Sequence, residues 1–206
     1  MKRTLRPRLL VATRSQHKLQ ELRELLHPAR AEVLSLDDLE VEGDPVEDGE
    51  TFRTNAAIKA RFGLRATGLP TLADDSGIEV DALGGAPGVR TRRYAGEQAT
   101  DADNNAKLLA ALDGLPPERR GARYVCVLAL AQPERDLQFT RGTCRGRIAN
   151  GPRGTGGFGY DPIFEPSTEP PGGRTFGQWS ADEKNRISHR ARAAQRMAVR
   201  LAESGF

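Results

Sequence analysis

Residues 69–77 read Leu69-Pro70-Thr71-Leu72-Ala73-Asp74-Asp75-Ser76-Gly77. The apolar run over 69–73 predicts a short buried strand, and Ser76 and Gly77 predict a turn directly after it. The adjacent carboxylates of Asp74 and Asp75 therefore stand where the strand is expected to end. Because ligands of open α/β sheets bind at the carboxyl ends of strands, the two groups are well placed for a metal ion or for proton transfer. An Asp-Asp pair is also common in ordinary turns, so the rest of the chain has to decide between these interpretations.

Strand and helix patterns alternate along the rest of the chain. Four further runs have the apolar or β-branched character of strands, over 8–13, 122–131, 137–143 and 146–149. Helical patterns cover 19–26, 52–66 and 100–113, and one last helix is expected to start at Ser180 with an apolar stripe of Ile187, Ala191, Ala194, Ala198 and Leu201. Residues 150–171 are rich in Gly and Pro and are expected to form a structured loop. We therefore expect a mixed α/β fold with helices around one long sheet.

Length and composition limit the class of protein. A chain of 206 residues with 37% hydrophobic and 29% charged residues suits a globular protein of one large domain or two lobes, and excludes a disordered chain. No apolar run approaches the roughly 20 residues that a membrane span requires. The basic start over 1–8 is followed only by the short apolar run 9–12, so we expect no signal peptide and a cytoplasmic location. Cys126 and Cys144 have neither metal-ligand nor disulfide spacing and are expected to be buried thiols.

Charge is distributed unevenly although the net charge is only +3. Residues 1–30 carry eight Lys/Arg against two Glu, whereas residues 31–50 carry nine Asp/Glu and no Lys/Arg. The C-terminal segment is basic again. Separate basic and acidic regions that fold together suit an anionic substrate bound with a divalent metal ion, although they could also be solvated faces.

The turn after the first predicted strand has the composition of a phosphate site. It consists of Thr13, Arg14, Ser15, Gln16, His17 and Lys18. A hydroxyl at the strand end, the backbone amides of a helix start and a lysine one turn into the helix can together hold a phosphate group. The alternative is an ordinary strand-to-helix turn with a solvated lysine.

A second candidate segment runs from Glu47 into the predicted helix 52–66. Asn55 and Lys59 are spaced i, i+4 and share one face of that helix. If the fold brings Glu47 and Asp75 together, their oxygens can bind Mg²⁺, which commonly uses one or two protein carboxylates and fills its other positions with water and substrate phosphate. The alternative is that the carboxylates before the helix only cap it.

Two later segments suit recognition of a nucleoside. The glycine-rich stretch 154–162 contains Phe158 and Tyr160, whose rings can stack on a base, and Gly159 and Asp161 lie beside them. The start of the last helix carries Lys184, His189 and Arg190, which are donors for the acceptor oxygens of an oxidised purine. A glycine-rich turn and a solvated basic helix face are the alternatives.

These signals in this order resemble the inosine triphosphate pyrophosphatase family, the Ham1-like non-standard purine nucleotide pyrophosphatases. The resemblance extends from Leu9 to about Ala194. Its most specific stretches are Leu69–Gly77, Val80–Leu83, Pro87–Val89, Arg93–Gly96, Gly157–Phe164 and Glu183–Arg190. It implies a single domain over 1–206 with two lobes on a long mixed sheet, a cleft between the lobes, and a homodimer. It also implies Mg²⁺-dependent hydrolysis of ITP, dITP and XTP to the monophosphate and pyrophosphate.

Residue roles follow from the same resemblance. Asp75 resembles the catalytic base and metal-linked carboxylate, Asp74 its supporting neighbour, and Glu47 the second metal carboxylate, with Asn55 and Lys59 in support. The substrate contacts that the resemblance implies are Thr13, Arg14, Ser15, Gln16, His17 and Lys18 for the triphosphate, Ser76 beside the catalytic pair, and Phe158, Gly159, Tyr160, Asp161, Lys184, His189 and Arg190 for the nucleoside.

The chain departs from the family pattern at four positions. The first loop of the family usually reads Thr-Gly-Asn, whereas Arg14 and Ser15 stand at its second and third positions here. The guanidinium of Arg14 could supply a phosphate contact. Thr54 replaces a usual acidic residue, and Gln178 replaces a usual Glu before the last helix.

Two other functions remain open at this stage. One is hydrolysis of modified pyrimidine nucleotides, as in the distantly similar Maf proteins. The other is a nucleic-acid-binding module that uses the basic N-terminus and the last helix, which the acidic residues 31–50 argue against. We expect a nucleoside triphosphate as the substrate, Mg²⁺ as the cofactor, and neither nucleic acid nor membrane as a partner.

Overall fold

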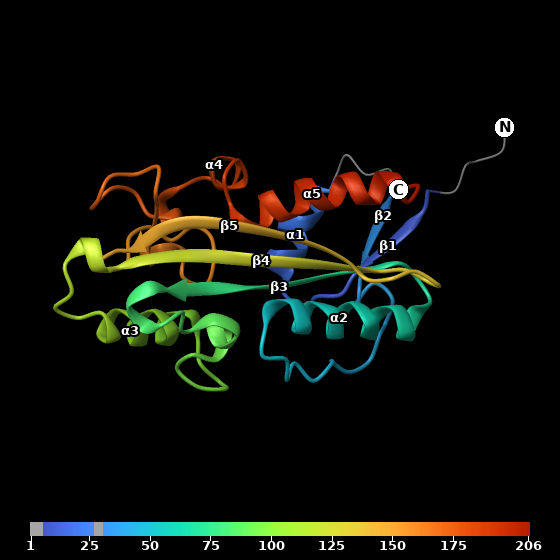
Figure 1. Ribbon diagram of the computed structural model, residues 1–206, viewed down its shortest axis with the longest axis horizontal. Coiled ribbons are helices and arrows are strands. Elements are labelled where there is room, and N and C mark those ends of the chain that lie inside the picture. Colours follow the sequence, from blue (N-terminus) through green and yellow to red (C-terminus); the bar gives the residue numbers. More distant parts are fainter. Residues whose placement is uncertain (1–5, 27–30) are drawn as a thin grey trace. The chain divides into compact units, whose positions relative to one another are not determined.

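The computed structural model describes residues 6–26 and 31–206 (Figure 1). The first part of the basic N-terminal start, residues 1–5, and His27 lie outside the described residues. The chain divides into two compact units. Unit 1 comprises residues 1–75, 126–142 and 190–206, and unit 2 comprises residues 76–125 and 143–189. No helix among the described residues combines the length and the hydropathy that crossing a bilayer would need.

The fold is α/β with one mixed sheet of six strands in the order β2-β1-β3-β4-β5-β6. The strands are β1 (Arg8–Val11), β2 (Glu32–Ser35), β3 (Thr71–Val80), β4 (Gly121–Ala131), β5 (Gln138–Ile148) and β6 (Phe164–Pro166). The α-helices are α1 (Gln16–Leu25), α2 (Phe52–Thr67), α3 (Asp101–Ala111), α4 (Ala181–Asn185) and α5 (His189–Glu203). β1 pairs in parallel with β2 and β3, and β5 pairs antiparallel with β6, which confirms the expected mixed sheet.

β3 differs from the predicted short strand followed by a turn. It continues through Asp74, Asp75, Ser76 and Gly77 to Val80, so the predicted turn at Ser76-Gly77 is wrong. Ile78 and Val80 are both fully buried, and their burial carries the extended chain past the two carboxylates. The aspartates nevertheless lie just beyond the carboxyl end of the neighbouring strand, β1. That strand ends at Val11, which is opposite Leu72 of β3.

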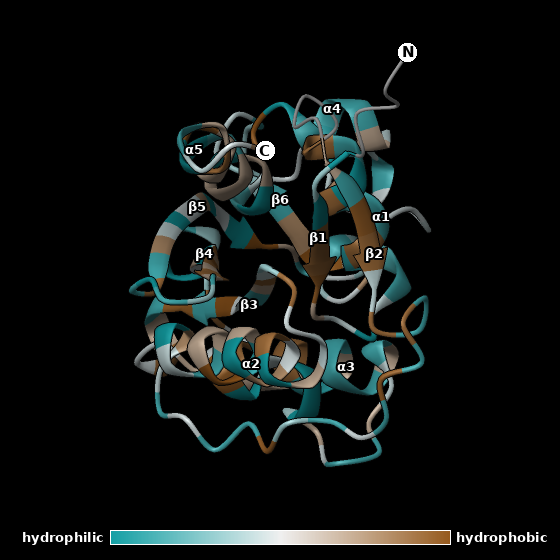
Figure 2. Cartoon of the chain, turned by 90° about the vertical axis from the view of Figure 1, so that its right-hand side faces the viewer, coloured by the Kyte–Doolittle hydropathy of each residue, from teal (hydrophilic) through white to brown (hydrophobic). Residues whose placement is uncertain are grey.

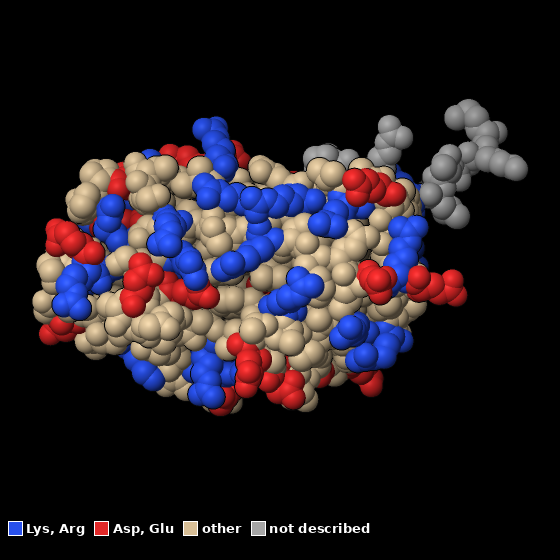
Figure 3. Space-filling view, viewed as in Figure 1, with Lys and Arg blue, Asp and Glu red and all other residues tan. Residues whose placement is uncertain are grey.

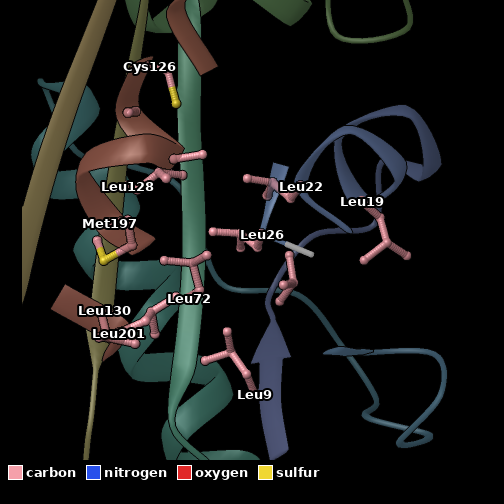
Figure 4. Packing of buried hydrophobic residues seen from close by; sticks show 13 residues of the cluster. Leu9, Leu19, Leu22, Leu26, Leu72, Cys126, Leu128, Leu130, Met197 and Leu201 are labelled. Carbon is pink, nitrogen blue, oxygen red and sulfur yellow. The ribbon is translucent and has the colours of Figure 1, made fainter. Parts of the chain in front are cut away.

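Unit 1 packs helices on the sheet, and Figure 2 shows β1 and β2 coloured as hydrophobic. Its core consists of residues from α1, α5, β1, β3 and β4, many of them labelled in Figure 4: Leu9, Leu19, Leu22, Leu26, Leu72, Cys126, Leu128, Leu130, Met197 and Leu201. α2 packs against β1 and β3 on the other side (Figure 1). A Cβ on Gly63 of α2 would lie 2.7 Å from Thr71 Cγ2 and 2.8 Å from Leu10 Cδ2, so the helix can approach this closely only with glycine at that position.

α5 is amphipathic, with Ala193, Ala194 and Met197 in the core of unit 1. Arg192, Arg196 and Arg200 are exposed and spaced i, i+4, i+8 along its outer face. Lys and Arg side chains gather along the upper part of the face shown in Figure 3, over α5. This helix therefore has a solvated basic face, but Lys184, His189 and Arg190, for which the sequence allowed such a face as an alternative, are buried.

Unit 2 has its own core. Residues of α3, β3, β4, β5 and the loop around β6 form it: Ile78, Val80, Leu108, Leu112, Ala122, Tyr124, Cys144, Ile148, Tyr160, Ile163, Phe164 and Phe176. Arg120 is buried among them, and its guanidinium donates to the carbonyl oxygens of Leu112, Ile148 and Ala149 at 2.7–2.8 Å. The buried guanidinium therefore satisfies carbonyl oxygens at the C-terminal ends of α3 and β5. Cys126 of unit 1 and Cys144 of unit 2 are both buried free thiols, as expected.

Three other predictions about elements need correction. The strands predicted over 137–143 and 146–149 are one continuous strand, β5. The predicted last helix is two helices, α4 and α5, separated at residues 186–188. Its supposed single stripe is divided, since Ile187 packs against the core of unit 2 whereas Ala194 and Leu201 belong to the core of unit 1. The strands β2 and β6 were not predicted, because each has only four or three residues.

Candidate active site

Asp74 is the centre of a buried charge cluster in unit 1. Its Oδ1 lies 2.6 Å from Lys18 Nζ, and its Oδ2 lies 3.0 Å from Arg190 Nε and accepts a hydrogen bond from Cys126 Sγ at 3.0 Å. Arg190 also pairs with Glu21 through its Nη1. Burial alone would raise the pKa of Asp74, but the charges of Arg190 and Lys18 outweigh it and hold this pKa well below the usual range. Asp74 is therefore ionised and cannot accept a proton near neutral pH.

Asp75 has a different environment although it is the next residue. Its Oδ1 lies 2.6 Å from Lys59 Nζ, and Lys59 Nζ also lies 3.1 Å from Glu47 Oε2. No group among the described residues donates a hydrogen bond to the buried Oδ2 of Asp75. Burial raises the pKa of Asp75, and the charge of Lys59 offsets this only in part. Asp75 is thus the more basic of the two carboxylates and has one oxygen left to bind something else.

The carboxylates of Glu47 and Asp75 fit a magnesium ion. One ammonium group contacts both Glu47 and Asp75, so the two carboxylates lie within reach of a single cation. Asp75 Oδ2 has a free coordination position, and the Glu47 side chain is 39% exposed, which leaves room for water or substrate oxygens. Within residues 6–26 and 31–206 no three His, Cys, Asp or Glu side chains cluster as a metal site. That donor set suits Mg²⁺, which needs only one or two protein carboxylates, better than Zn²⁺.

The predicted phosphate turn leads into α1. Ser15 is the N-cap of this helix and accepts a hydrogen bond from Lys18 N, while Thr13 Oγ1 accepts one from Ser15 N at 3.2 Å. Ser15 thus replaces the usual Asn as a cap without loss of the helix start. Lys18 is the first charged group on the helix, and it extends to Asp74. The structure therefore brings Lys18 to Asp74.

Arg14 and Gln16 point away from this turn. The Arg14 guanidinium binds Asp37, Asp44 and the carbonyl oxygens of Val41 and Gly43. Gln16 Nε2 lies 3.4 Å from Asp37 Oδ2. The expectation that Arg14 supplies a phosphate contact is therefore not met in this conformation.

The start of α2 is held by local hydrogen bonds. Thr51 and Thr54 form a reciprocal capping box, so Thr54 does here what an acidic residue usually does at that position. Asn55 is buried and its Oδ1 accepts a hydrogen bond from Gly49 N at 2.8 Å. Asn55 thus supports the loop that carries Glu47. Gln178 forms a similar capping box with Thr175 in unit 2.

In unit 2 the nucleoside segments meet at Asp161. Its Oδ2 lies 2.6 Å from Lys184 Nζ and accepts a hydrogen bond from Phe158 N, and its Oδ1 accepts one from Tyr124 OH at 3.1 Å. The backbone of Gly157 has φ +70°, and a Cβ there would overlap with the Asp161 carboxylate. Only glycine therefore allows this loop to close on its own aspartate.

Aromatic rings surround this charge pair. Lys184 Nζ lies 4.7 Å from the centroid of the half-buried Phe158 ring. The His189 ring stacks on Tyr124 at 4.5 Å with an interplanar angle of 7°. Tyr160 is buried and its hydroxyl donates to Thr91 O, so the stacking face expected of Tyr160 is covered, whereas Phe158 keeps part of its ring exposed. Asn105 Nδ2 donates to Gly159 O at 3.1 Å, which fixes the loop against α3.

Several site residues could not be identified from the sequence. Cys126, Tyr124 and Glu21 lie in apolar or helical patterns that contain no motif. Only the tertiary structure brings Cys126 to Asp74, Tyr124 to Asp161 and Glu21 to Arg190. His189 and Arg190 were predicted to act together, but His189 belongs to unit 2, where it stacks on Tyr124, and Arg190 belongs to unit 1, where it binds Asp74. Ser76 follows Asp75 in β3, where a turn was predicted, and His17 lies in the first turn of α1.

Comparison with known proteins agrees with the sequence motifs and the fold. The model of the Ham1 family matches residues 9–200. The chain is 50% identical to a dITP/XTP pyrophosphatase of Syntrophobacter fumaroxidans over 90% of this chain and 78% of that protein, and 47% identical to one of Geobacillus kaustophilus over 92% and 91%. The solved structure of a HAM1 protein from Coxiella burnetii is similar with a TM-score of 0.85 and 40% identity, covering 96% of this chain and 99% of that one. The chain therefore belongs to the Ham1 family.

Proposed function

We propose that the protein is a nucleoside triphosphate pyrophosphatase that hydrolyses ITP, dITP and XTP to the monophosphate and pyrophosphate, with Mg²⁺ as its metal ion. Support comes from the relatives named dITP/XTP pyrophosphatase and from the residues of the two units. The observation that carries the proposal is Asp75, a buried carboxylate with one oxygen on Lys59 and the other without a partner in the described part of the chain.

Unit 1 has the groups for the phosphate chemistry. Lys18, Lys59 and the N-terminus of α1 supply positive charge for a triphosphate, and phosphoryl transfer depends mainly on such positioning and neutralisation. A bound Mg²⁺ would be held by Asp75 and Glu47 and would neutralise phosphate oxygens. Asp75 accepts the proton of the water that attacks the α-phosphorus, because its raised pKa makes it the stronger base of the pair. Asp74 stays ionised and holds Lys18 in place.

Unit 2 has the groups for the nucleoside. Phe158 offers a partly exposed ring for stacking, and Lys184 and His189 are donors that suit the 6-oxo group of hypoxanthine or xanthine. Adenine has an amino group at that position, so buried donors would be left unpaired and ATP rejected by a factor of roughly 10⁴. Arg190 is bound to Asp74 and Glu21, so reading of the base by Arg190 requires another side-chain conformation.

The finer expectations on assembly belong to the same proposal. The resemblance to the family implies a homodimer, and the sequence patterns favour a cytoplasmic location and no nucleic-acid partner. Light scattering of the purified protein measures the first of these directly.

The test is the release of pyrophosphate from ITP, XTP, GTP, ATP and dTTP, with and without Mg²⁺. We expect turnover of ITP and XTP only with the metal ion. Asp75→Asn should lower kcat on ITP by about 10²–10⁴, the range for loss of a general base. Asp81→Asn, which changes an exposed carboxylate of unit 2, is the matched control and should leave kcat unchanged.

Two outcomes would contradict the proposal in different ways. Unchanged ITP turnover in Asp75→Asn would remove the assigned base. Turnover of dTTP as fast as that of ITP would favour a pyrimidine nucleotide pyrophosphatase instead.

A further inference from the structure

The side chain of Arg14 fastens an acidic segment to the phosphate turn of unit 1. Its Nε lies 3.1 Å from Asp44 Oδ1, and one of its terminal nitrogens pairs with Asp37. The other terminal nitrogen donates to Val41 O at 2.6 Å and to Gly43 O at 2.9 Å. Four of the five N–H groups of one guanidinium therefore hold residues 37–44.

The segment that Arg14 holds depends on cations from outside it. Residues 31–50 contain nine Asp/Glu and no Lys/Arg. Among the described residues, four cations of unit 1 pair with it: Arg8 with Glu32, Arg14 with Asp37 and Asp44, Arg23 with Asp38, and Lys59 with Glu47. Arg14 is the one that binds the middle of the segment at two carboxylates and two backbone carbonyls.

The backbone under Arg14 has an unfavourable conformation. Glu40 has φ 51°, which is uncommon for a residue with a Cβ and which persists only where surrounding contacts enforce it. Gly43, also within the held stretch, has φ +74°. The bonds from Arg14 to both sides of Glu40 add to the backbone hydrogen bonds from Glu40 N to Asp37 O and from Val41 N to Leu36 O in holding this loop shape.

The held stretch continues directly to a proposed metal ligand. Asp44 precedes Glu47 by three residues, which is at most about 10 Å of extended chain. Glu47 pairs with the ammonium of Lys59, and Asn55 holds the loop after it through Gly49 N. A shift of residues 37–44 would therefore move the Glu47 carboxylate relative to Asp75.

We propose that Arg14 is a positioning residue that holds residues 37–44 and thereby places Glu47 for the metal ion, and that it does not bind the substrate phosphates. This inference rests on the proposed function, in which Glu47 and Asp75 hold Mg²⁺. A phosphate contact would require Arg14 to give up two ion pairs and two carbonyl bonds, which together hold its guanidinium on residues 37–44.

Two variants with opposite charge changes test the inference. Arg14→Ala removes one positive charge, and the double variant Asp37→Asn/Asp44→Asn removes two negative charges. The first readout is Mn²⁺ binding without nucleotide, measured by electron paramagnetic resonance. The second is cleavage by the Glu-specific protease Glu-C after Glu40, Glu42 or Glu47, since trypsin has no site within residues 31–50.

A role in positioning predicts the same effect for both variants. Each variant should bind Mn²⁺ roughly three- to tenfold more weakly, the range that loss of a few partly exposed ion pairs gives. Each variant should also be cut faster by Glu-C. Simple electrostatics predicts opposite effects, because Arg14→Ala would then strengthen Mn²⁺ binding. Arg8→Ala, which breaks an exposed pair with Glu32 in the same unit, is the matched control and should change neither readout.

Other outcomes overturn the inference. The inference fails if Mn²⁺ binding and cleavage stay unchanged in both variants, or if the two variants have opposite effects. It also fails if the wild type binds no Mn²⁺. A direct phosphate contact would appear as a raised KM for ITP in Arg14→Ala and an unchanged or lower KM in the double variant. The proposed function fails separately, if wild type does not hydrolyse ITP or XTP.

Discussion

Asp74 and Asp75 are adjacent and chemically identical, but their surroundings change their pKa values in opposite directions. Asp74 lies between two cations, Lys18 and Arg190, whose charges outweigh the effect of burial and lower its pKa. Asp75 has a single cation, Lys59, and burial raises its pKa. A pair of carboxylates whose pKa values are separated in this way can divide the work, one holding charges in place and the other accepting a proton.

The first prediction concerns the stability that Asp74 provides. Asp74→Asn removes the partner of the fully buried Arg190 and should lower the free energy of unfolding at pH 7 by about 3–5 kcal/mol. The folded pKa is lowered, so the stabilisation is present above the unfolded pKa of about 4 and is lost as the pH falls toward the folded pKa. The difference between wild type and variant should therefore shrink below about pH 4.

Urea unfolding at pH 7, 5 and 3.5 measures this difference. Glu32→Gln, which removes the carboxylate of an exposed pair with Arg8, is the control and should change stability by no more than about 0.5 kcal/mol. A difference for Asp74→Asn that stays constant over the whole pH range would contradict a charged role for Asp74.

At the scale of secondary structure, local patterns predicted the helices better than the ends of strands. The capping boxes at Thr100 and Ser180 mark the starts of α3 and α4 correctly, because a cap is a property of four consecutive residues. The turn at Ser76-Gly77 was predicted wrongly, because turn residues also fit extended chain when buried neighbours such as Ile78 continue the strand. Strand length is decided by burial in the folded protein, which the sequence alone does not contain.

The site residues also divide into those that a local motif identifies and those that only tertiary contacts identify. The motifs identified Asp75, Lys18 and Lys184 because their residue types suit phosphate and base chemistry, and the structure places each of them in a charge pair. The sequence could not identify Cys126 or Tyr124, whose contacts with Asp74 and Asp161 join residues 52 and 37 positions apart. Arg14 shows the limit most clearly, since its residue type suits phosphate but its bonds go to carboxylates and carbonyls.

The second prediction concerns the loop between β5 and β6. Gly157→Ala places a Cβ against the carboxylate of Asp161, so Asp161 must move away from Lys184 and from Phe158 N. We expect a loss of about 1–3 kcal/mol in the free energy of unfolding. We also expect a KM for ITP raised about tenfold with a smaller change in kcat, because the loop holds the nucleoside and not the reacting phosphate.

Gly84→Ala is the matched control for this loop. Gly84 also has a positive φ, +62°, but nothing lies within 4 Å of its Cβ position. The control should lose about 1 kcal/mol through backbone strain alone and keep its KM. Equal KM values in Gly157→Ala and wild type would show that the position of Asp161 does not control nucleotide binding.

At the scale of the whole chain, the two units have separate cores but share three strands. β3 contributes Leu72 to the core of unit 1 and Ile78 to that of unit 2, and β4 contributes Leu128 and Tyr124 in the same way. β5 likewise has residues in both units, since its part up to Gly142 belongs to unit 1 and its part from Thr143 belongs to unit 2. When one core unfolds, the shared strands lose neighbours in that unit, and this also destabilises the part of each strand that belongs to the other unit. We therefore expect the two cores to unfold together.

The third prediction tests this cooperativity with a probe that belongs to one unit. Trp179 is the only tryptophan and packs against the core of unit 2, whereas Leu128 is fully buried in the core of unit 1. Leu128→Ala should cost about 2–5 kcal/mol, and its urea midpoint should fall equally by Trp179 fluorescence and by far-ultraviolet circular dichroism. Val199→Ala, on the exposed side of α5, is the control and should leave both midpoints unchanged. If the fluorescence midpoint stays at its wild-type value while circular dichroism shows two transitions, the units unfold independently despite their shared strands.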